Sequence, residues 1–275
     1  MRKIGFVIDS TFGYKGSEVI VVPLNVYVGN KEYVDGSIDN QEIVNALEDG
    51  TKISTSQPAP SLFLEAYKKQ LESYEHVICL TLSKELSGTY NSASLAKDML
   101  ESDNVTIVDT GSIAFGAIDI FEKTLKFMET EQDLNKILNH IEVLKSKGSI
   151  IFSVDNLKTL VRNGRLGKIS GFIGNVLKIK PILRFKEGIL NVEAKVRGLL
   201  GAFKYIVNQV ASLADNNKVD VNIAYVDNAG YANELLDMIK ELNNENINAK
   251  ILGNVSPVVS AHIGIGGMGI YLTTV

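Results

Sequence analysis

The chain of 275 residues has 28 Lys and Arg against 32 Asp and Glu, a formal net charge of −4, and it contains no basic tract, which argues against a nucleic-acid-binding protein. Its composition, 45% hydrophobic and 22% charged, is that of a globular protein, and no stretch approaches the roughly 18 apolar residues of a membrane span. Cys79 is the single cysteine, which excludes an intramolecular disulfide, and the first apolar run ends at Asp9, too early for a secretory signal. We expect a soluble, cytoplasmic protein without membrane insertion.

The first half of the chain alternates short apolar runs with amphipathic segments. The apolar runs predict buried strands at 4–8, 19–28, 77–82 and 105–108, with a short extended stretch at 32–34. The amphipathic segments predict helices at 40–47, from Ser61 onward, and at 89–100, 113–128 and 133–145. This alternation is typical of a mostly parallel sheet flanked by helices.

The second half of the chain has a different pattern. It predicts a strand at 149–154, a helical turn at 157–161 and an antiparallel hairpin of 181–185 with 190–196. A helix at 202–213 and a strand–helix–strand unit at 219–226, 232–242 and 247–252 follow. We therefore expect an α/β protein with two α/β domains, residues 1–148 with a parallel sheet and residues 149–275 with a mixed sheet.

The segment Ser54-Thr55-Ser56-Gln57-Pro58-Ala59-Pro60 combines three hydroxyls and an amide with two prolines, just ahead of a predicted helix. Prolines restrict their own backbone and push the preceding residue out of the helical region, so we expect a stiff loop. Hydroxyls beside the free N–H groups of a helix N-terminus suit an oxyanion or a carboxylate. An ordinary helix cap is the alternative interpretation.

Polar clusters follow three predicted strands, at 9–11, 83–90 and 109–112. The carboxyl ends of parallel strands share one edge of a sheet, where ligands bind, so the convergence of these loops indicates a binding site. Each cluster alone is also compatible with a helix cap.

A glycine-rich segment near the C-terminus follows His262 and contains a formal G-x-G-x-x-G match. We reject a dinucleotide site, because that motif requires a following helix and an acidic residue about 20 positions on. Glycines without a helix indicate a flat loop with His262 at its entrance, either as a ligand-binding group or as a structural residue. The three histidines are far apart and no metal-ligand spacing or phosphate-binding Walker loop occurs, so we expect neither metal nor cofactor.

Nine segments, taken in order along the whole chain, resemble the DegV family of bacterial fatty-acid-binding proteins, which includes the binding subunit of the fatty acid kinase system. They are Asp9-Ser10-Thr11, Val22-Pro23-Leu24, Thr55-Ser56-Gln57-Pro58, Leu86-Ser87-Gly88-Thr89-Tyr90, Val108-Asp109-Thr110, Asn163-Gly164-Arg165-Leu166-Gly167, Lys180-Pro181-Ile182-Leu183, Lys195-Val196-Arg197 and His262-Ile263-Gly264. Two positions depart from the family pattern. Gly264-Ile265-Gly266 stands where Gly-Pro-Gly is frequent, and Asn163 stands where a glycine is common.

The resemblance implies a long-chain fatty acid bound between the two domains, with its acyl chain in an apolar tunnel. The family's carboxylate-binding hydroxyls correspond to Thr55 and Ser87, and its C-terminal histidine to His262. With the neighbouring residues of these motifs, the expected ligand-binding set is Thr55, Ser56, Ser87, Gly88, Thr89, His262 and Gly264.

The resemblance also implies a partner, because some members hand the fatty acid to a kinase that makes acyl phosphate for phospholipid synthesis. Nothing in the site as predicted forms a phosphate cradle or a two-metal centre, so we expect no catalysis by the chain itself. We expect Arg165 and Arg197, supported by Arg162 and Lys168, to face the kinase; plain solvated charges are the alternative.

Two other functions remain open from the sequence. Ser87, His262 and Asp9 or Asp109 could form the triad of a serine hydrolase of acyl esters, although Ser87 lacks the G-x-S-x-G elbow. A polar-metabolite or sugar-binding module is the other, and it would have a cavity lined by charged groups instead of an apolar tunnel.

Overall fold

The structure is a computed structural model that describes residues 2–155, 157–166 and 179–275. Sheet A has four parallel strands in the order β2-β1-β6-β7. They are β1 (Arg2–Asp9), β2 (Ile20–Val22), β6 (Tyr74–Thr81) and β7 (Val105–Asp109). The mostly parallel sheet expected from the sequence is confirmed.

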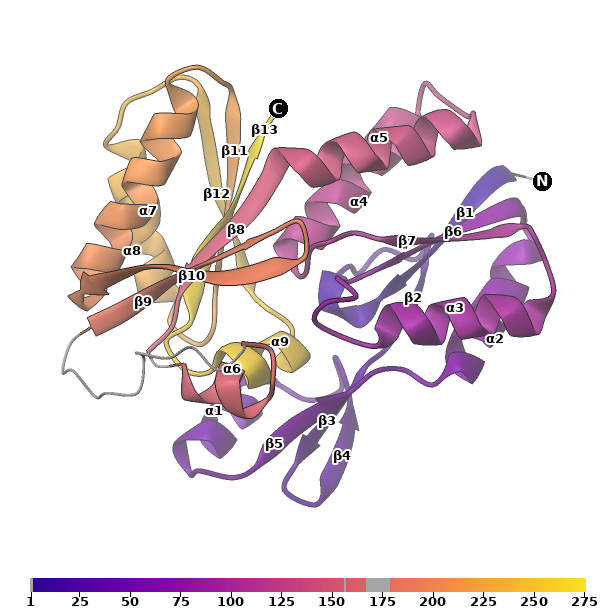
Figure 1. Ribbon diagram of the computed structural model, residues 1–275, viewed down its shortest axis with the longest axis horizontal. Helices are drawn as coiled ribbons and strands as arrows, with labels where there is room; N and C mark the ends of the chain where they lie inside the picture. The colour runs from indigo at the N-terminus through magenta and orange to yellow at the C-terminus, as the bar shows by residue number, and fades with distance from the viewer. Residues whose placement is uncertain (1, 156, 167–178) are drawn as a thin grey trace.

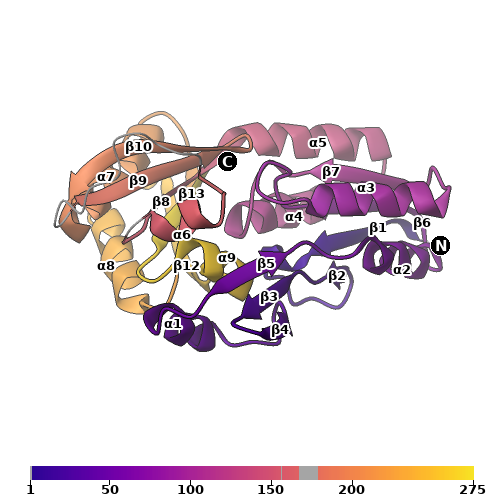
Figure 2. The ribbon, with the colours of Figure 1, turned by 60° about the horizontal axis from the view of Figure 1, so that its bottom comes forward.

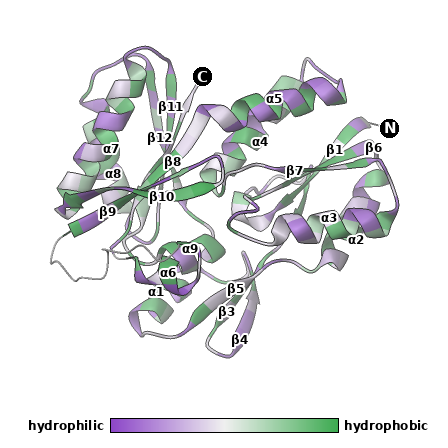
Figure 3. Ribbon diagram, viewed as in Figure 1, coloured by the Kyte–Doolittle hydropathy of each residue, from purple (hydrophilic) through white to green (hydrophobic). Residues whose placement is uncertain are grey.

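Helices cover both faces of sheet A, because successive side chains of a strand point to opposite faces. On β1, Phe6 and Ile8 pack in a cluster with α4 (Phe115–Met128) and α5 (Leu134–Lys147). Val7 packs with α2 (Pro60–Leu71) and α3 (Thr89–Leu100) on the other face, where Cys79 is also buried, as expected for a small core residue. Helices such as α3 and α5 carry both hydrophobic and hydrophilic residues, as one buried face requires (Figure 3).

Sheet B is a small antiparallel sheet in the order β4-β3-β5. It comprises β3 (Asn25–Val28), β4 (Lys31–Val34) and β5 (Ile53–Ser56). The single strand predicted over 19–28 is wrong, because β2 and β3 lie in different sheets on either side of Pro23. Proline has no N–H for a strand ladder, and the N–H of Leu24 donates instead to Ser10 Oγ at 3.1 Å. The stiff loop predicted to carry Ser54, Thr55 and Ser56 is likewise wrong, because these residues lie in β5.

Sheet C is a mixed sheet in the order β10-β9-β8-β13-β11-β12. Its strands are β8 (Gly148–Ser153), β9 (Ile179–Lys186), β10 (Ile189–Arg197), β11 (Val219–Tyr225), β12 (Ile247–Asn254) and β13 (Met268–Thr274). One face packs on α7 (Gly198–Ala214) and α8 (Ala229–Lys240). The mixed sheet and the β9–β10 hairpin were both predicted, whereas β13 was not. The flat loop expected for the glycine-rich segment holds for Gly264, Gly266 and Gly267, which precede β13, but Gly269 lies in β13, in the middle of the sheet between β8 and β11.

Short helices join the two halves of the molecule. The helix α9 (Pro257–Ile263) belongs to the second half of the sequence but packs with α1 (Asn40–Glu48) and sheet B, and α6 (Lys158–Arg162) lies beside it (Figures 1 and 2). His262 therefore lies on a helix that reaches into the first half of the molecule. The chain enters sheet C at Gly148, directly from α5, but the division into domains 1–148 and 149–275 stays a prediction.

Candidate ligand-binding site

A cavity lies between the face of sheet C that α7 and α8 leave uncovered and the strand-end loops, α4 and α9. Its empty volume is about 1010 Å³, including the open space at its mouth. Most of the lining is aliphatic or aromatic, with contributions from Phe115, Phe152, Phe185 and Val259. A cavity of this kind suits an apolar ligand.

The polar groups of the lining gather at one end. Apart from two tyrosines, the polar side chains among the described lining residues are Thr55, Ser87, Arg165 and His262. Direct contacts connect their positions: Thr55 Oγ1 lies 2.7 Å from His262 Nε2, and Arg165 Nε donates to the carbonyl of Leu86, next to Ser87, at 3.2 Å. Residues from β5, the loop after β6, the segment after α6 and α9 thus form one polar end.

Thr55 faces the cavity because of the alternation along β5. Ile53, two residues earlier on the same face, is buried in the cluster that contains Val258 and Ala261 of α9. Thr55 therefore points toward α9, where it meets His262. Ser56 lies on the opposite face, 3.4 Å from the hydroxyl of Tyr27, and is not among the residues that line the cavity.

The hydrogen bonds around His262 assign its tautomer. Asn163 Nδ2 lies 3.3 Å from His262 Nδ1 and also 3.3 Å from the carbonyl oxygen of Ala261, which fixes the amide with its NH₂ toward both acceptors. Nδ1 then accepts a hydrogen bond, and Nε2 carries the proton that it donates to Thr55 Oγ1. The hydroxyl proton of Thr55 is left available to donate to a ligand.

His262 is neutral at neutral pH in this arrangement. Burial, together with the positive charge of Arg165, lowers the pKa of His262 to about 4. Burial also lowers the pKa of Arg165 from its ordinary value, but an arginine stays charged. The guanidinium is therefore the permanent positive charge at the polar end.

Ser87 and its neighbours form a tight turn at the start of α3. Ser87 Oγ lies 2.9 Å from Thr89 Oγ1, which is fully buried, so Thr89 supports Ser87 but does not line the cavity. Gly88 permits a close approach of Gln57, whose Oε1 would lie 1.8 Å from a Cβ at that position. Gln57 Nε2 donates to Ser92 Oγ at 2.9 Å, which holds the end of β5 against α3 and brings Thr55 toward Ser87.

A second hollow adjoins the polar end and shares Thr55, Arg165 and His262 with the cavity. Its other described lining residues are Lys52, Ile53, Ser54, Arg162 and Asn163, none of them acidic. Positive charge thus surrounds the place where the polar end meets the surface.

The sequence model described as an uncharacterised protein of the DegV family matches residues 3–274 of the chain. The chain belongs to the DegV family. A DegV domain-containing protein of Clostridium acetobutylicum is 31% identical over 280 residues, 98% of each chain.

Solved structures of DegV proteins share this fold. The structure described as the fatty acid binding of a DegV family protein from Thermus thermophilus has a TM-score of 0.90 at 29% identity and covers 99% of this chain and 100% of that one. The Streptococcus pneumoniae Fatty Acid Kinase (Fak) B3 protein, loaded with linoleic acid, has a TM-score of 0.86 at 22% identity, over 99% of this chain and 100% of that one. At 22% identity, the similarity to the Streptococcus pneumoniae protein shows only that the two proteins share a fold.

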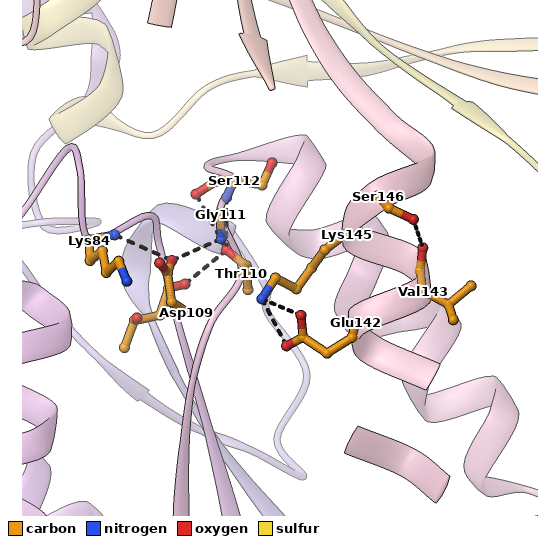
Figure 4. Close-up of polar contacts among 10 residues, drawn as sticks. Lys84, Asp109, Thr110, Gly111, Ser112, Glu142, Val143, Lys145 and Ser146 are labelled. Atoms are coloured by element: carbon orange, nitrogen blue, oxygen red, sulfur yellow. Dashed lines mark hydrogen bonds and ion pairs between the residues drawn. The ribbon is translucent and has the colours of Figure 1, made fainter. Parts of the chain in front are cut away.

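Two of the three polar clusters that follow the strands of sheet A, those of Asp9 and Asp109, connect neighbouring loops of this DegV chain through hydrogen bonds. Asp9 is fully buried and accepts hydrogen bonds from Thr11 and from the N–H of Leu82, and burial raises the pKa of Asp9 to about 6. Asp109 Oδ1 accepts from the N–H of Gly111 at 2.8 Å and of Lys84 at 3.3 Å (Figure 4). Neither carboxylate lines the cavity, so of the three clusters only the second contributes a predicted site residue, Ser87.

The remaining predicted residues lie at different distances from the cavity. Gly264 ends α9 at φ +83°, a conformation that favours glycine, and so shapes the turn into β13 without lining the cavity. Arg165 was predicted to face a partner, but its side chain lines the cavity. Arg197 is exposed at the end of β10, and Lys168 lies outside the described residues.

Proposed function

We propose that the chain binds a long-chain fatty acid, with the carboxylate at the polar end and the acyl chain along the apolar wall. The observation that carries this proposal is the gathering of Thr55, Ser87, Arg165 and His262 at one end of an otherwise apolar cavity. The relative from Thermus thermophilus, described as binding a fatty acid, supports the same ligand class.

Each polar group has a part in holding the carboxylate. Thr55 and Ser87 donate their hydroxyl protons, and His262 orients Thr55. Arg165 supplies the positive charge that lets a carboxylate keep its ionised form at depth. A charged hydrogen bond contributes about 1.5–3 kcal/mol, so the head group fixes the orientation of the ligand.

The acyl chain supplies most of the affinity. Burial of about 14 methylenes at roughly 0.8 kcal/mol each gives on the order of 11 kcal/mol before the costs of binding. A polar metabolite or a sugar would leave this apolar wall without a partner, so a polar-metabolite module is not favoured.

A serine hydrolase is not favoured either. A triad would require a hydrogen bond from the histidine to Ser87 and a carboxylate on its other nitrogen. His262 instead contacts Thr55 through Nε2 and the Asn163 amide through Nδ1. The chain is proposed to be a binding protein without catalysis of its own.

We further propose that the bound fatty acid is presented to a separate kinase, which brings the nucleotide and its metal ion for acyl-phosphate formation. The support is the basic hollow at the polar end, where Lys52, Arg162 and Arg165 surround the proposed carboxylate position. Arg197, exposed at the end of β10, is proposed as a further contact of the kinase.

Mass spectrometry of material extracted from the purified protein under denaturing conditions tests the ligand class. The expected result is a fatty acid at a stoichiometry near one per chain. Purified protein that carries no fatty acid, and that binds none when a delipidated sample is titrated by calorimetry, contradicts the proposal.

A further inference from the structure

The cavity lining on sheet C ends part-way along the central strand β13. Gly269 and Tyr271 lie two residues apart on one face of β13 and both line the cavity, as does Gly267, which directly precedes the strand. The next residue on that face, Thr273, is not among the lining residues. Along this segment the lining therefore runs from Gly267 to Tyr271, includes Met268 and Ile270, and ends at the aromatic ring.

On the neighbouring strand β11, the cavity lining ends at the same level. Ala224 pairs with Gly269 and lines the cavity, whereas Asn222 pairs with Tyr271 and does not. Both strands thus place the end of the lining at the Tyr271 level, on the side away from α9 and the polar end.

The ring of Tyr271 is held tightly at this position. It is 3% exposed and lies against the backbone of two glycines, one on α4 and one on β8. A Cβ on Gly116 would lie 3.0 Å from the ring, and a Cβ on Gly148 would lie 2.4 Å from Cζ. The ring has no room to move toward either element.

Beyond the ring lies a cluster of polar and charged side chains. On α4, which lies between sheets A and C (Figures 1 and 2), Asp119 and Lys123 follow Gly116 on one face of the helix, and Lys123 Nζ is 2.8 Å from Asp119 Oδ2. From β11, Asn222 Nδ2 donates to Asp119 Oδ1 at 3.3 Å, and Asp220 Oδ2 lies 3.3 Å from Lys123 Nζ. An alkyl chain that extended past Tyr271 would displace the partners of the buried carboxylate of Asp119, which is costly.

We propose that Tyr271 is the floor of the cavity and limits the length of the acyl chain that the protein accepts. The inference rests on the proposed fatty acid binding and adds to it a residue that determines specificity. The ring blocks the chain sterically, and the polar cluster of Asp119, Lys123, Asp220 and Asn222 makes the space behind the ring unfavourable for methylenes.

The test compares the affinities of delipidated wild-type protein and Tyr271→Leu for saturated fatty acids of increasing length. Each methylene buried in the cavity raises the affinity about fourfold, so the wild-type affinity climbs with length and stops climbing at one chain length. In Tyr271→Leu, which removes the ring, we expect the climb to continue to longer chains. Tyr271→Met serves as a second variant, because its flexible side chain can bend away from the ligand.

Two control variants distinguish the loss of the cavity floor from a general loss of packing around the ligand. Tyr271→Phe keeps the ring and should stop at the wild-type length. Phe152→Leu removes a ring from the wall, at the Gly269 level, and should change all affinities by a similar factor without moving the stopping length. An unchanged stopping length in both Tyr271→Leu and Tyr271→Met overturns the inference, whereas a wild-type protein that binds no fatty acid of any length overturns the proposed function itself.

Discussion

At the scale of single residues, the site depends on a chain of hydrogen bonds that runs from Asn163 through His262 to Thr55. The amide sets the tautomer of the imidazole, and the imidazole orients the hydroxyl. Asn163, a departure from the family's common glycine in sequence, therefore has a defined structural role. The chain of bonds turns Thr55 into a donor, which is what a carboxylate ligand needs.

The hydroxyls at the polar end give the first prediction. Thr55→Ala and Ser87→Ala should each weaken fatty acid binding by about 1.5–3 kcal/mol, because each removes a hydrogen bond to a charged acceptor. Calorimetric titration measures the change. Ser56→Ala is the matched control, since Ser56 lies on the opposite face of β5, and its affinity should equal that of the wild type. Unchanged affinity in both Thr55→Ala and Ser87→Ala would remove the hydroxyls from the head-group site.

The protonation of His262 gives the second prediction. In the ligand-free protein burial, with the charge of Arg165, lowers the pKa of His262 to about 4. A bound carboxylate favours the imidazolium, so binding should raise this pKa. By linkage, affinity should increase as the pH falls below the pKa of the complex, as long as the ligand carboxyl stays ionised. Conversely, in the free protein the depressed pKa contributes stability above the ordinary histidine pKa, and this contribution is lost as the pH falls toward 4.

An NMR titration of the His262 ring, with and without a fatty acid, measures both states. His262→Gln identifies the signal and should remove the pH dependence of affinity. The same midpoint in both states would mean that the ring does not sense the ligand carboxylate.

At the scale of elements, α9 positions the histidine, and side chains from the first half of the chain hold α9 in place. Asn40, at the start of α1, donates through Nδ2 to the carbonyl oxygen of Val255 at 2.7 Å and accepts from Ser260 Oγ at 2.8 Å. Asp35 accepts from the N–H of Val258 at 3.2 Å. A helix of only seven residues has little stability by itself, so these long-range contacts fix its position.

Asn40 therefore supplies a prediction at this scale. Asn40→Ala should lower the free energy of unfolding by about 1–3 kcal/mol, because it leaves the fully buried hydroxyl of Ser260 without its acceptor. Chemical denaturation measures the change. Asn45→Ala on the same helix is the control: Asn45 is exposed, its hydrogen-bond partner is Gln41 one turn earlier, and stability should change little. Equal stability of the two variants would show that Asn40 does not fasten α9.

At the scale of the whole molecule, the polar end of the cavity and the basic hollow adjoin each other, so a partner at this surface would meet the head group directly. Arg165 lines both the cavity and the basic hollow, so an Arg165 variant cannot distinguish ligand binding from partner binding. Arg197 is exposed and does not line the cavity, so it can report on the partner alone.

For the partner surface we expect a variant that loses the reaction with the kinase but keeps fatty acid binding. Arg197→Ala should bind fatty acid as the wild type does and lose acyl-phosphate formation when a cognate kinase and ATP are supplied. Added salt should weaken the wild-type reaction, because the association is steered by charge. Lys69→Ala removes an equal charge from the exposed face of α2 and should keep full turnover. Full turnover by Arg197→Ala would place the kinase elsewhere, and loss of fatty acid binding would place Arg197 in the ligand site.

None of the helices in the described part of the chain is both long and apolar enough to cross a membrane. Within the same ranges, no group of three His, Cys, Asp or Glu side chains is placed to hold a metal ion.

The sequence by itself determined most elements and the fold class, because hydrophobic periodicity is a local property that follows the element type. The helix predicted at 89–100 has those bounds in the structure, and the residues Thr55, Ser87 and His262, predicted from scattered motifs, all line the cavity. The family was likewise readable from the order of the motifs, and the two kinds of sheet from the order of the predicted strands and helices.

Only the tertiary structure decided which of these polar residues meet. Pro23 sends two halves of one apolar run into different sheets, and Gly269 becomes part of a central strand because β8 and β11 pair with β13 from both sides. Asn163 reaches His262 across 99 positions, and Arg165 turns inward to the carbonyl of Leu86. Such contacts join residues far apart in the chain, and a local pattern carries no information about which distant backbone will lie beside it.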